Sequence, residues 1–464
     1  MKDRKLDRDR IDFANDKIGP LFRALFFPTL IGMIFNSALT VIDGIFVGQG
    51  VGANGIAAVN IVAPIYMIAT GIGLMFGIGS SVVASIRLSE NNDKAARIIM
   101  TQAFTVGLVI ISLICFGALL CPHPFLKLLG CTPMLESNAT DYLLWILPGL
   151  FFLFIQCVGM MLIRLDGSPK YAMTVQIVGA VINIALDWYM IFPLGLGVKG
   201  AAIATSIACI IAGLMVLAYF VWFPDRLRFY RIKTSVTAIL LTLRNTLYIM
   251  RLGFATFLTE FAMSIMMLTG NYMFISMLGE DGVAAFAIAC YLFPIVFSIS
   301  NAVAQSAQPI ISYNYGAHLT GRVNRTLKVS LFTAVLCGII VMVGLWGGKD
   351  WIVRMFLSPE EPAYSMATSG LPLFSICAIF FAVNIAFIGY YQSIEKALLS
   401  TIYTMLRGII FLVPSFILLP QLTGVAGLWL AIPCAEVLTS IMIITRYTIS
   451  QKANDLSTSR LNQQ

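Results

Sequence analysis

Residues 183–205, with the sequence NIALDWYMIFPLGLGVKGAAIAT, decide how the rest of the chain is interpreted. An amide, Asn183, and a carboxylate, Asp187, lie one helical turn apart within an otherwise apolar segment. A Pro/Gly turn follows, and a second apolar helix then begins with small residues. A carboxylate inside an apolar helix is costly to keep, so Asp187 is a functional candidate.

Part of this segment recurs in the second half of the chain. Residues 197–202, GVKGAA, resemble GVAGLW at 424–429, which is an offset of 227 residues. Residues 43–47, DGIFV, similarly resemble NYMFI at 271–275. Because the offset is close to half of the 464 residues, the sequence predicts two homologous halves.

The composition indicates an integral membrane protein. Of the 464 residues, 59% are hydrophobic and 11% are charged, whereas soluble domains carry about 25% charged residues. At about 20 apolar residues for each span, the chain has room for roughly a dozen helices. The apolar runs are too long for the strands of a membrane barrel, and the alternation typical of such strands is missing. We therefore expect an all-α membrane protein.

Twelve membrane-spanning helices in two six-helix lobes are expected. The predicted helices cover residues 21–48, 56–86, 97–121, 139–163, 171–192, 200–223, 246–278, 283–312, 327–347, 366–392, 397–419 and 425–447. The predicted domains are a cytoplasmic segment at 1–20, an N-lobe at 21–223, a cytoplasmic loop at 224–245, a C-lobe at 246–447 and a cytoplasmic tail at 448–464. Since each half has an even number of helices, both enter the membrane in the same direction, and the pseudo-two-fold repeat is parallel.

The distribution of Lys and Arg predicts the orientation. With the N-terminus inside, the cytoplasmic segments carry 25 of these residues, and the outer segments carry only Lys127, Lys199, Lys349 and Arg354. Cytoplasmic loops are enriched in positive charge, so both termini are predicted to be cytoplasmic. The basic residues that give the net charge of +8 lie at the ends of the apolar runs, as is typical of a membrane protein. We therefore expect no nucleic-acid partner.

Polar side chains of the first half are predicted to lie at a similar depth. At about 1.5 Å per residue, Asp43, Asp187 and Thr205 are each roughly 9 Å from the outer ends of their helices. Asn183 shares the face of Asp187, one turn away. Two neighbouring carboxylates can share a proton. Together with the Asn and Thr oxygens, the two carboxylates can instead hold Na⁺, and only in that case are the four residues metal ligands.

The alternative is that each Asp hydrogen-bonds a neighbouring helix and has a structural role.

Two further polar residues, Asn36 and Thr40, share a helix face with Asp43 and are weighed as coupling residues. Asp141 and Asp166 lie near helix ends, where we expect them to be solvated.

The second half holds a different polar group. Glu260, Arg407 and Glu436 are each predicted to lie roughly 14–17 Å from the cytoplasmic side. We interpret them first as a structural ion-pair cluster, because a buried charge must be paired. A share of Glu260 and Arg407 in cation or substrate coupling is the alternative.

Energy and cofactor motifs are missing from the sequence. There is no phosphate loop of the G-x-x-x-x-G-K-[ST] type and no soluble domain large enough for a nucleotidase. We expect no nucleotide and no cofactor. The process is therefore expected either to take its energy from an ion gradient or to be passive. Without a His cluster or a nucleophile–base pair, an enzyme is not expected. A disulfide between Cys121 and Cys131, which share a predicted loop, is left open.

Four motifs resemble the multidrug and toxic compound extrusion (MATE) family, in its bacterial multidrug branch. They are DGIFVG at 43–48, NIALD at 183–187, GAAIAT at 200–205 and AQPIISYNYGA at 307–317. The resemblance covers about residues 18–450. It implies antiport of organic, often cationic, drugs against H⁺ or Na⁺ by alternating access. It also implies a multi-pass protein of the bacterial inner membrane, which we expect to act as a monomer.

The resemblance also carries residue roles. In family members with an N-lobe cation site, the matching positions here are Asp43, Asn183, Asp187 and Thr205. Glu260 resembles an acid that some members use together with a second acid, but here the second position is Asn384. This departure favours the N-lobe site.

A flippase for lipid-linked oligosaccharides, which shares the fold, is the alternative function. Such proteins tend to line their cavity with several Arg and Lys for pyrophosphate, whereas only Arg407 is clearly intramembrane here. A receptor or scaffold role leaves the carboxylates of the first half unexplained.

Overall fold

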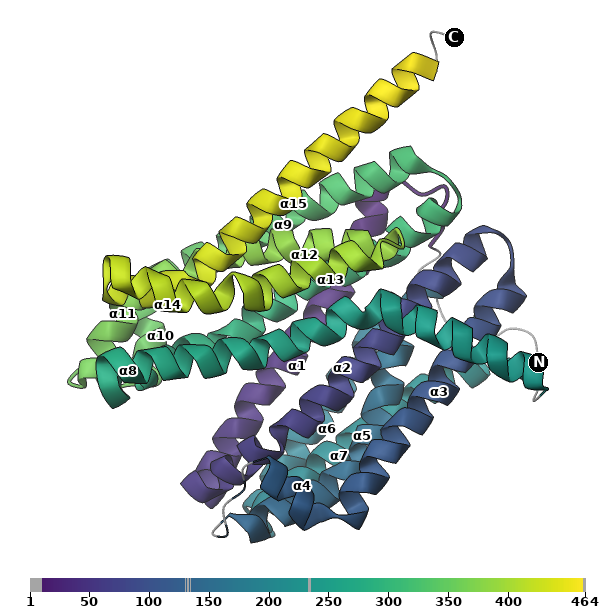
Figure 1. The fold of residues 1–464 in the computed structure, drawn as a ribbon. Coiled ribbons are helices and arrows are strands. Elements are labelled where there is room, and N and C mark those ends of the chain that lie inside the picture. Colours follow the sequence, from purple (N-terminus) through teal and green to yellow (C-terminus); the bar gives the residue numbers. More distant parts are fainter. Residues whose placement is uncertain (1–10, 130, 132, 134, 233–234, 462–464) are drawn as a thin grey trace. The chain divides into compact units, whose positions relative to one another are not determined.

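The described part of the chain is entirely helical and loop. In a computed structural model, the described residues are 11–129, 131, 133, 135–232 and 235–461, and these ranges contain no strand (Figure 1). The first ten residues of the predicted N-terminal segment and the last three of the predicted tail lie outside the described residues.

The helices follow one another with short connections. The helices of the first half are α1 (Ile18–Val51), α2 (Ala53–Ser89), α3 (Asp93–Leu120), α4 (Pro122–Leu128), α5 (Glu136–Leu165), α6 (Pro169–Ile191) and α7 (Gly197–Trp222). Those that follow are α8 (Val236–Gly316), α9 (Thr320–Gly347), α10 (Lys349–Arg354), α11 (Pro362–Ser375), α12 (Cys377–Ser393), α13 (Ala397–Met405), a π-helical turn (Leu406–Ile410), α14 (Leu412–Thr423) and α15 (Val425–Leu461).

Eleven segments of the described chain are long and apolar enough to cross a membrane. The count is one lower than the twelve predicted because α8, with 81 residues, includes two predicted helices. Its backbone leaves the helical region at Gly279, where φ is 67°. That conformation suits glycine, which has no Cβ to clash there. The break therefore falls at the turn expected between residues 278 and 283.

Several predicted helix limits are wrong. α8 begins ten residues earlier than expected, where the Ser235 hydroxyl accepts a hydrogen bond from the Ala238 amide and so satisfies one free amide of the first turn. α15 continues to Leu461 instead of ending at 447, because a helix can extend beyond the apolar run that marks the bilayer. The helix expected at 366–392 is interrupted after Ser375, within one turn of Pro372, which lacks an amide donor.

The chain divides into two compact units. Unit 1 consists of Met1–Phe261, Gln305–Val329 and Gln392–Ala397, and unit 2 of Ala262–Ala304, Ser330–Tyr391 and Leu398–Gln464. This grouping follows compactness, whereas the predicted lobes follow the internal repeat. The lobe limits, like the cytoplasmic location of the termini, stay a prediction.

In unit 1, glycines allow helices to approach closely. A side chain at Gly32 of α1 would meet Gln176 of α6, and one at Gly50 would meet Ile191. Since both residue numbers increase together, α1 and α6 run parallel. Gly79 of α2 and Gly253 of α8 similarly lie against backbone of the opposite helix. Small residues at such crossings are typical of membrane helices.

Unit 2 has its own aromatic core. The rings of Phe274 and Phe286 stack with centroids 4.5 Å apart, and Trp429 packs edge-on against Phe274 at 5.1 Å. Offset and edge-on arrangements are favoured by aromatic pairs. The nine cysteines all lie within the described ranges and form no disulfide, so Cys121 and Cys131 are not joined.

Candidate functional site

Asp43 and Asp187 lie at the same level of two parallel helices. Each is eleven residues beyond the contact between Gly32 of α1 and Gln176 of α6, from 32 to 43 and from 176 to 187. At about 1.5 Å per residue, both carboxylates are roughly 16 Å further along. The similar depth expected from the sequence therefore agrees with the packing of α1 on α6.

One buried face of α6 presents the polar residues. Gly179, Asn183 and Asp187 follow one another at intervals of four and are all buried, so they lie along one stripe of the helix. The exposed fraction is 1% for Asn183 and 0% for Asp187, which excludes lipid or bulk water as the partner of either side chain.

A turn with two glycines of positive φ, Gly195 at 62° and Gly197 at 58°, separates α6 from α7. α7 then packs against α6. The Asn183 amide donates a hydrogen bond of 3.2 Å to the Thr205 hydroxyl of α7. Two of the four predicted site residues are thus in direct contact.

The two carboxyl groups interact with each other across the α1–α6 interface. Yet both oxygens of Asp187 and Oδ1 of Asp43 are buried without an N–H or O–H donor anywhere in the described chain. These observations agree if one carboxyl group carries a proton, since two carboxylates cannot hydrogen bond each other. The alternative is a cation between them, because an isolated buried carboxylate is very costly.

Two tyrosines near the carboxylates were not found from the sequence. Tyr142 of α5 is within electrostatic reach of both Asp43 and Asp187, and Tyr66 of α2 is within reach of Asp43. A phenol hydroxyl donates or accepts a hydrogen bond. A tyrosine in an apolar helix is so ordinary that nothing in the sequence alone distinguishes these two.

Asn36 and Thr40 differ from the rest of the predicted set. Both side chains are exposed, and the Thr40 hydroxyl donates to the Asn36 carbonyl of its own helix at 3.3 Å. Within the described ranges, no hydrogen bond joins either side chain to Asp43. Their share in coupling stays a prediction.

A multivalent metal centre has no counterpart in the described ranges, where three or more His, Cys, Asp or Glu side chains never gather. A site of two carboxylates, one amide and one hydroxyl differs from such a centre. Its oxygen atoms suit a proton or a hard monovalent cation.

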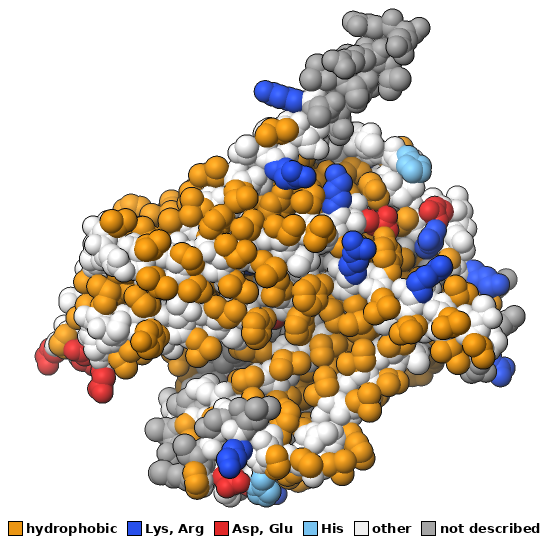
Figure 2. Space-filling view, viewed as in Figure 1, with side chains coloured by type: hydrophobic (Ala, Val, Ile, Leu, Met, Phe, Trp, Pro, Cys, Tyr) orange, Lys and Arg blue, Asp and Glu red, His pale blue; other side chains and the backbone are white. Residues whose placement is uncertain are grey.

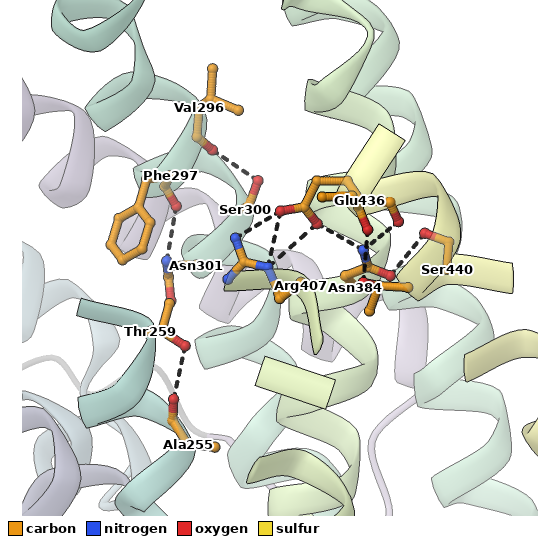
Figure 3. Close-up of polar contacts among 12 residues, drawn as sticks. Ala255, Thr259, Val296, Phe297, Ser300, Asn301, Asn384, Arg407, Glu436 and Ser440 are labelled. Carbon is orange, nitrogen blue, oxygen red and sulfur yellow. Dashed lines mark hydrogen bonds and ion pairs between the residues drawn. The ribbon is translucent and has the colours of Figure 1, made fainter. Parts of the chain in front are cut away.

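The polar group of unit 2 is an ion pair held by three helical segments (Figure 3). Arg407 lies in the π-helical turn and Glu436 in α15. The guanidinium donates from Nη2 to Glu436 Oε1 at 3.0 Å and from Nε to the same oxygen at 3.1 Å. π-Helical turns frequently occur at functional sites, so the location of Arg407 is noteworthy beyond its pairing.

Asn384 of α12 completes this group. Its amide donates to Glu436 Oε2 at 2.8 Å, and its own oxygen accepts from Ser440 at 2.8 Å. The Arg407 guanidinium also lies over the Phe381 ring, 4.2 Å from the centroid. Within this group of side chains, Nη1 of Arg407 is buried and has no hydrogen-bond partner among the residues described.

Glu260 belongs to unit 1 and is half-buried in α8 beside Gly71 of α2. Arg407 and Glu436 belong to unit 2. The ion pair of Arg407 and Glu436 forms within unit 2, and the share of Glu260 in the expected cluster stays a prediction.

Asp166, expected to be solvated, is buried at the end of α5, so this prediction was wrong. Its carboxylate accepts hydrogen bonds from the Tyr219 hydroxyl and from the amides of Asp225, Arg226 and Leu227. Burial raises the pKa of Asp166 above its ordinary value, and these hydrogen bonds act in the opposite direction. The carboxylate fastens the segment after α7 to the end of α5.

Comparison with known proteins identifies relatives over most of the chain. A family model described as MatE matches residues 28–189 and 255–417. The two matches begin 227 residues apart, which is the offset found within the sequence. The multidrug export protein MepA of Staphylococcus saprophyticus subsp. saprophyticus is 24% identical over 413 residues, covering 88% of this chain and 90% of that protein. MepA of Staphylococcus aureus strain MRSA252 is 22% identical over 427 residues, covering 91% and 92%.

Solved structures show the same fold. One is described as the outward-facing conformation of a multidrug resistance MATE family transporter of the MOP superfamily. It matches with a TM-score of 0.88 at 21% identity and covers 97% of this chain and 99% of its own. A MOP superfamily transporter from Pyrococcus furiosus matches with a TM-score of 0.87 at 21% identity, covering 96% and 98%. These matches confirm the predicted helical membrane fold.

Proposed function

The chain belongs to the MatE family, and from this premise we propose that it exports small organic molecules, often cationic, in exchange for H⁺ or Na⁺. Relatives named as multidrug export proteins support drugs as the exported class. We further propose a monomer in the bacterial plasma membrane, with both termini cytoplasmic. The proposal requires neither nucleotide nor cofactor, and no catalytic step.

One observation supports ion exchange above all others. The buried oxygens of Asp187 and Asp43 Oδ1 have no donor among the residues described, although the two carboxyl groups interact. A buried carboxylate is energetically costly when it is ionised without a partner, and it is neutralised when it holds a proton or Na⁺. Such a group favours alternate binding and release of the cation. We propose Asp43 and Asp187 as the charged ligands, with the oxygens of Asn183 and Thr205 as neutral ligands.

Loading of this site would change the energy of the α1–α6–α7 group. If drug and cation disfavour each other's binding, each must weaken the other's affinity by the same factor. Release of the cation on one side would then favour drug binding there, and its return would favour drug release. α1 contains Pro28, whose missing amide provides a place where the helix can bend.

The unit 2 group does not favour the flippase alternative. Its single Arg is engaged by Glu436 and lies over Phe381. A pyrophosphate would have to compete with an existing carboxylate partner, so we retain drug export as the proposed function.

The test is transport of tetraphenylphosphonium by purified protein in proteoliposomes, with a proton gradient and a Na⁺ gradient imposed separately. Wild-type protein should export the probe with at least one gradient. Asp187→Asn should fold, since Asn is nearly isosteric and needs no counter-charge, and should reduce export to the level of empty vesicles.

Asp141→Asn is the matched control, because Asp141 is an exposed acid on α5. It should transport like the wild type. A folded Asp187→Asn protein that exports at the wild-type rate with unchanged cation dependence would remove the site from the proposal and direct attention to Glu260.

A further inference from the structure

A cavity of about 750 Å³ lies in unit 1, away from the paired carboxylates. Its walls come from the end of α2, the first turns of α3 and the first turns of α8, together with the segment before α8. Val83, Ile99 and Leu241 provide apolar surface from the three helices. The close approach of α8 to α2 at Gly79 is one turn from Val83, so the cavity lies next to this helix crossing. A cavity of this size is typical of small-molecule sites.

Positive charge dominates the lining. Four basic side chains line the cavity, namely Arg87, Lys94, Arg231 and Arg244, against one acid, Glu395. Figure 2 shows Lys and Arg side chains gathered where α8 begins, beside a surface that is largely apolar.

Most of this charge is not neutralised by the protein. Arg87 pairs with Glu90 at 2.8 Å, and Glu395 accepts a hydrogen bond of 2.6 Å from Tyr248. By contrast, Lys94, Arg231 and Arg244 form no ion pair within the described ranges. A surplus of cationic side chains in one cavity favours an anionic ligand.

Hydrogen bonds fix the polar part of the wall. Gln102, buried in α3, donates to the Thr242 hydroxyl at 2.9 Å and accepts from the Asn245 amide at 3.0 Å. Both partners are on α8, so α3 and α8 are joined beside the cavity. These hydrogen bonds therefore fix the position of the cavity wall. The wall combines an aliphatic surface with cationic side chains.

We propose that this cavity binds an anionic phospholipid, with the phosphate at Lys94, Arg231 and Arg244 and the glycerol and upper acyl chains along Val83, Ile99 and Leu241. Guanidinium groups match phosphate oxygens in a two-pronged geometry. Basic pockets between membrane helices on the cytoplasmic side suit acidic lipid headgroups, and this is the side to which the Lys and Arg bias assigns the cavity.

Alternative occupants fit less well. An organic cation, the proposed export class, would be repelled by the surplus positive charge. Free phosphate satisfies the cations but leaves the aliphatic wall without a partner. The lipid site is independent of drug export, so it stands or fails by binding alone.

The test is native mass spectrometry of the purified full-length chain in detergent with added phosphatidylglycerol or phosphatidylcholine of equal chain length. Wild-type protein should bind phosphatidylglycerol more tightly. Each basic residue near a membrane surface is worth about fivefold in affinity, so Arg231→Gln with Arg244→Gln should weaken binding about 25-fold. Ala238→Phe, which narrows the cavity without changing charge, should also weaken it.

The matched control is Arg228→Gln with Arg325→Gln, two exposed residues of unit 1 that do not line the cavity. It should bind phosphatidylglycerol like the wild type. An equal loss in both double variants would overturn the site in favour of general surface charge. Full displacement of the lipid by millimolar inorganic phosphate would overturn the lipid in favour of a free-anion site. Unchanged binding in Arg231→Gln with Arg244→Gln and in Ala238→Phe would also overturn it.

Discussion

Two buried polar groups of the molecule differ in how their charges are satisfied. In unit 1, Asp43 and Asp187 interact, but their buried oxygens have no protein donor within the described residues. In unit 2, the carboxylate of Glu436 accepts hydrogen bonds from Arg407 and Asn384. One group needs something from outside the chain, whereas the other already contains its counter-charge.

This difference teaches that burial of an acid does not by itself indicate function. A buried carboxylate with a fixed counter-charge or several donors stabilises the structure only while all partners remain. A buried carboxylate without them is costly, and removing its charge relieves that cost. The two groups should therefore respond to substitution in opposite ways.

Arg407→Ala tests this contrast with the largest expected effect on stability. The change leaves Glu436 buried without its counter-charge, and breaking a buried pair costs about 3–5 kcal/mol. The variant should unfold at a clearly lower temperature in detergent. Asp187→Asn should unfold at or above the wild-type temperature, because it removes a buried carboxyl group whose oxygens have no donor among the described residues.

The matched control removes both charges of the pair. Arg407→Met with Glu436→Gln should recover most of the lost stability, since no unpaired charge remains. If Arg407→Ala proves as stable as the wild type but inactive in export, Arg407 acts in transport and the contrast between the groups fails.

Asp166→Asn should have the next largest effect, because Asp166 is an acid satisfied by hydrogen bonds alone. Each of its two oxygens accepts two hydrogen bonds. An amide nitrogen in place of either oxygen faces two donors, which costs about 1–3 kcal/mol. Thermal unfolding measures the loss. Asp141→Asn, on the same helix but exposed, should change the unfolding temperature little, and equal losses would argue against the hydrogen bonds as the cause.

Much of the fold was predictable from the sequence because the bilayer imposes long apolar runs. The internal repeat and the turn at Gly279 were expected. Helix ends were not, since the beginning of α8 depends on a cap from Ser235, and the interruption near Pro372 depends on local backbone chemistry. Hydrophobicity marks where a chain crosses the membrane, and it says little about where a helix begins.

The candidate site was predictable only in part. The distance of each residue from its helix end predicted that Asp43 and Asp187 would lie at one level. This works because every residue of a helix adds a fixed rise, so that residue numbers give relative depth in parallel helices. The burial of Asp166 was missed because its backbone donors come from a segment about 60 residues later. Tyr66 and Tyr142 were missed because packing, and not spacing, brings them near.

Asn183→Ala tests the neutral part of the unit 1 group. It removes the hydrogen bond to Thr205, a loss of about 1 kcal/mol in the free energy of unfolding. Because both carboxylates remain, export should persist at a higher half-saturating cation concentration. Loss of all export in a folded variant would show that Asn183 is more than a neutral ligand.

Asn36→Ala should have the smallest effect. It tests how far along α1 the polar group of unit 1 extends from Asp43. Asn36 lies two turns before Asp43 and is exposed, and its carbonyl, which the substitution retains, accepts the Thr40 hydroxyl. Exposed substitutions without special contacts usually change stability by less than about 0.5 kcal/mol, which corresponds to roughly twofold in an equilibrium. Export rate and its half-saturating cation concentration should both remain within about twofold of the wild type in the proteoliposome assay. A tenfold shift in the cation concentration would extend the group by two turns to Asn36. The site would then require a conformation in which the Asn36 side chain turns toward Asp43. In that case, the presence or absence of buried hydrogen-bond and charge partners would no longer be enough to distinguish the unit 1 group from the unit 2 group.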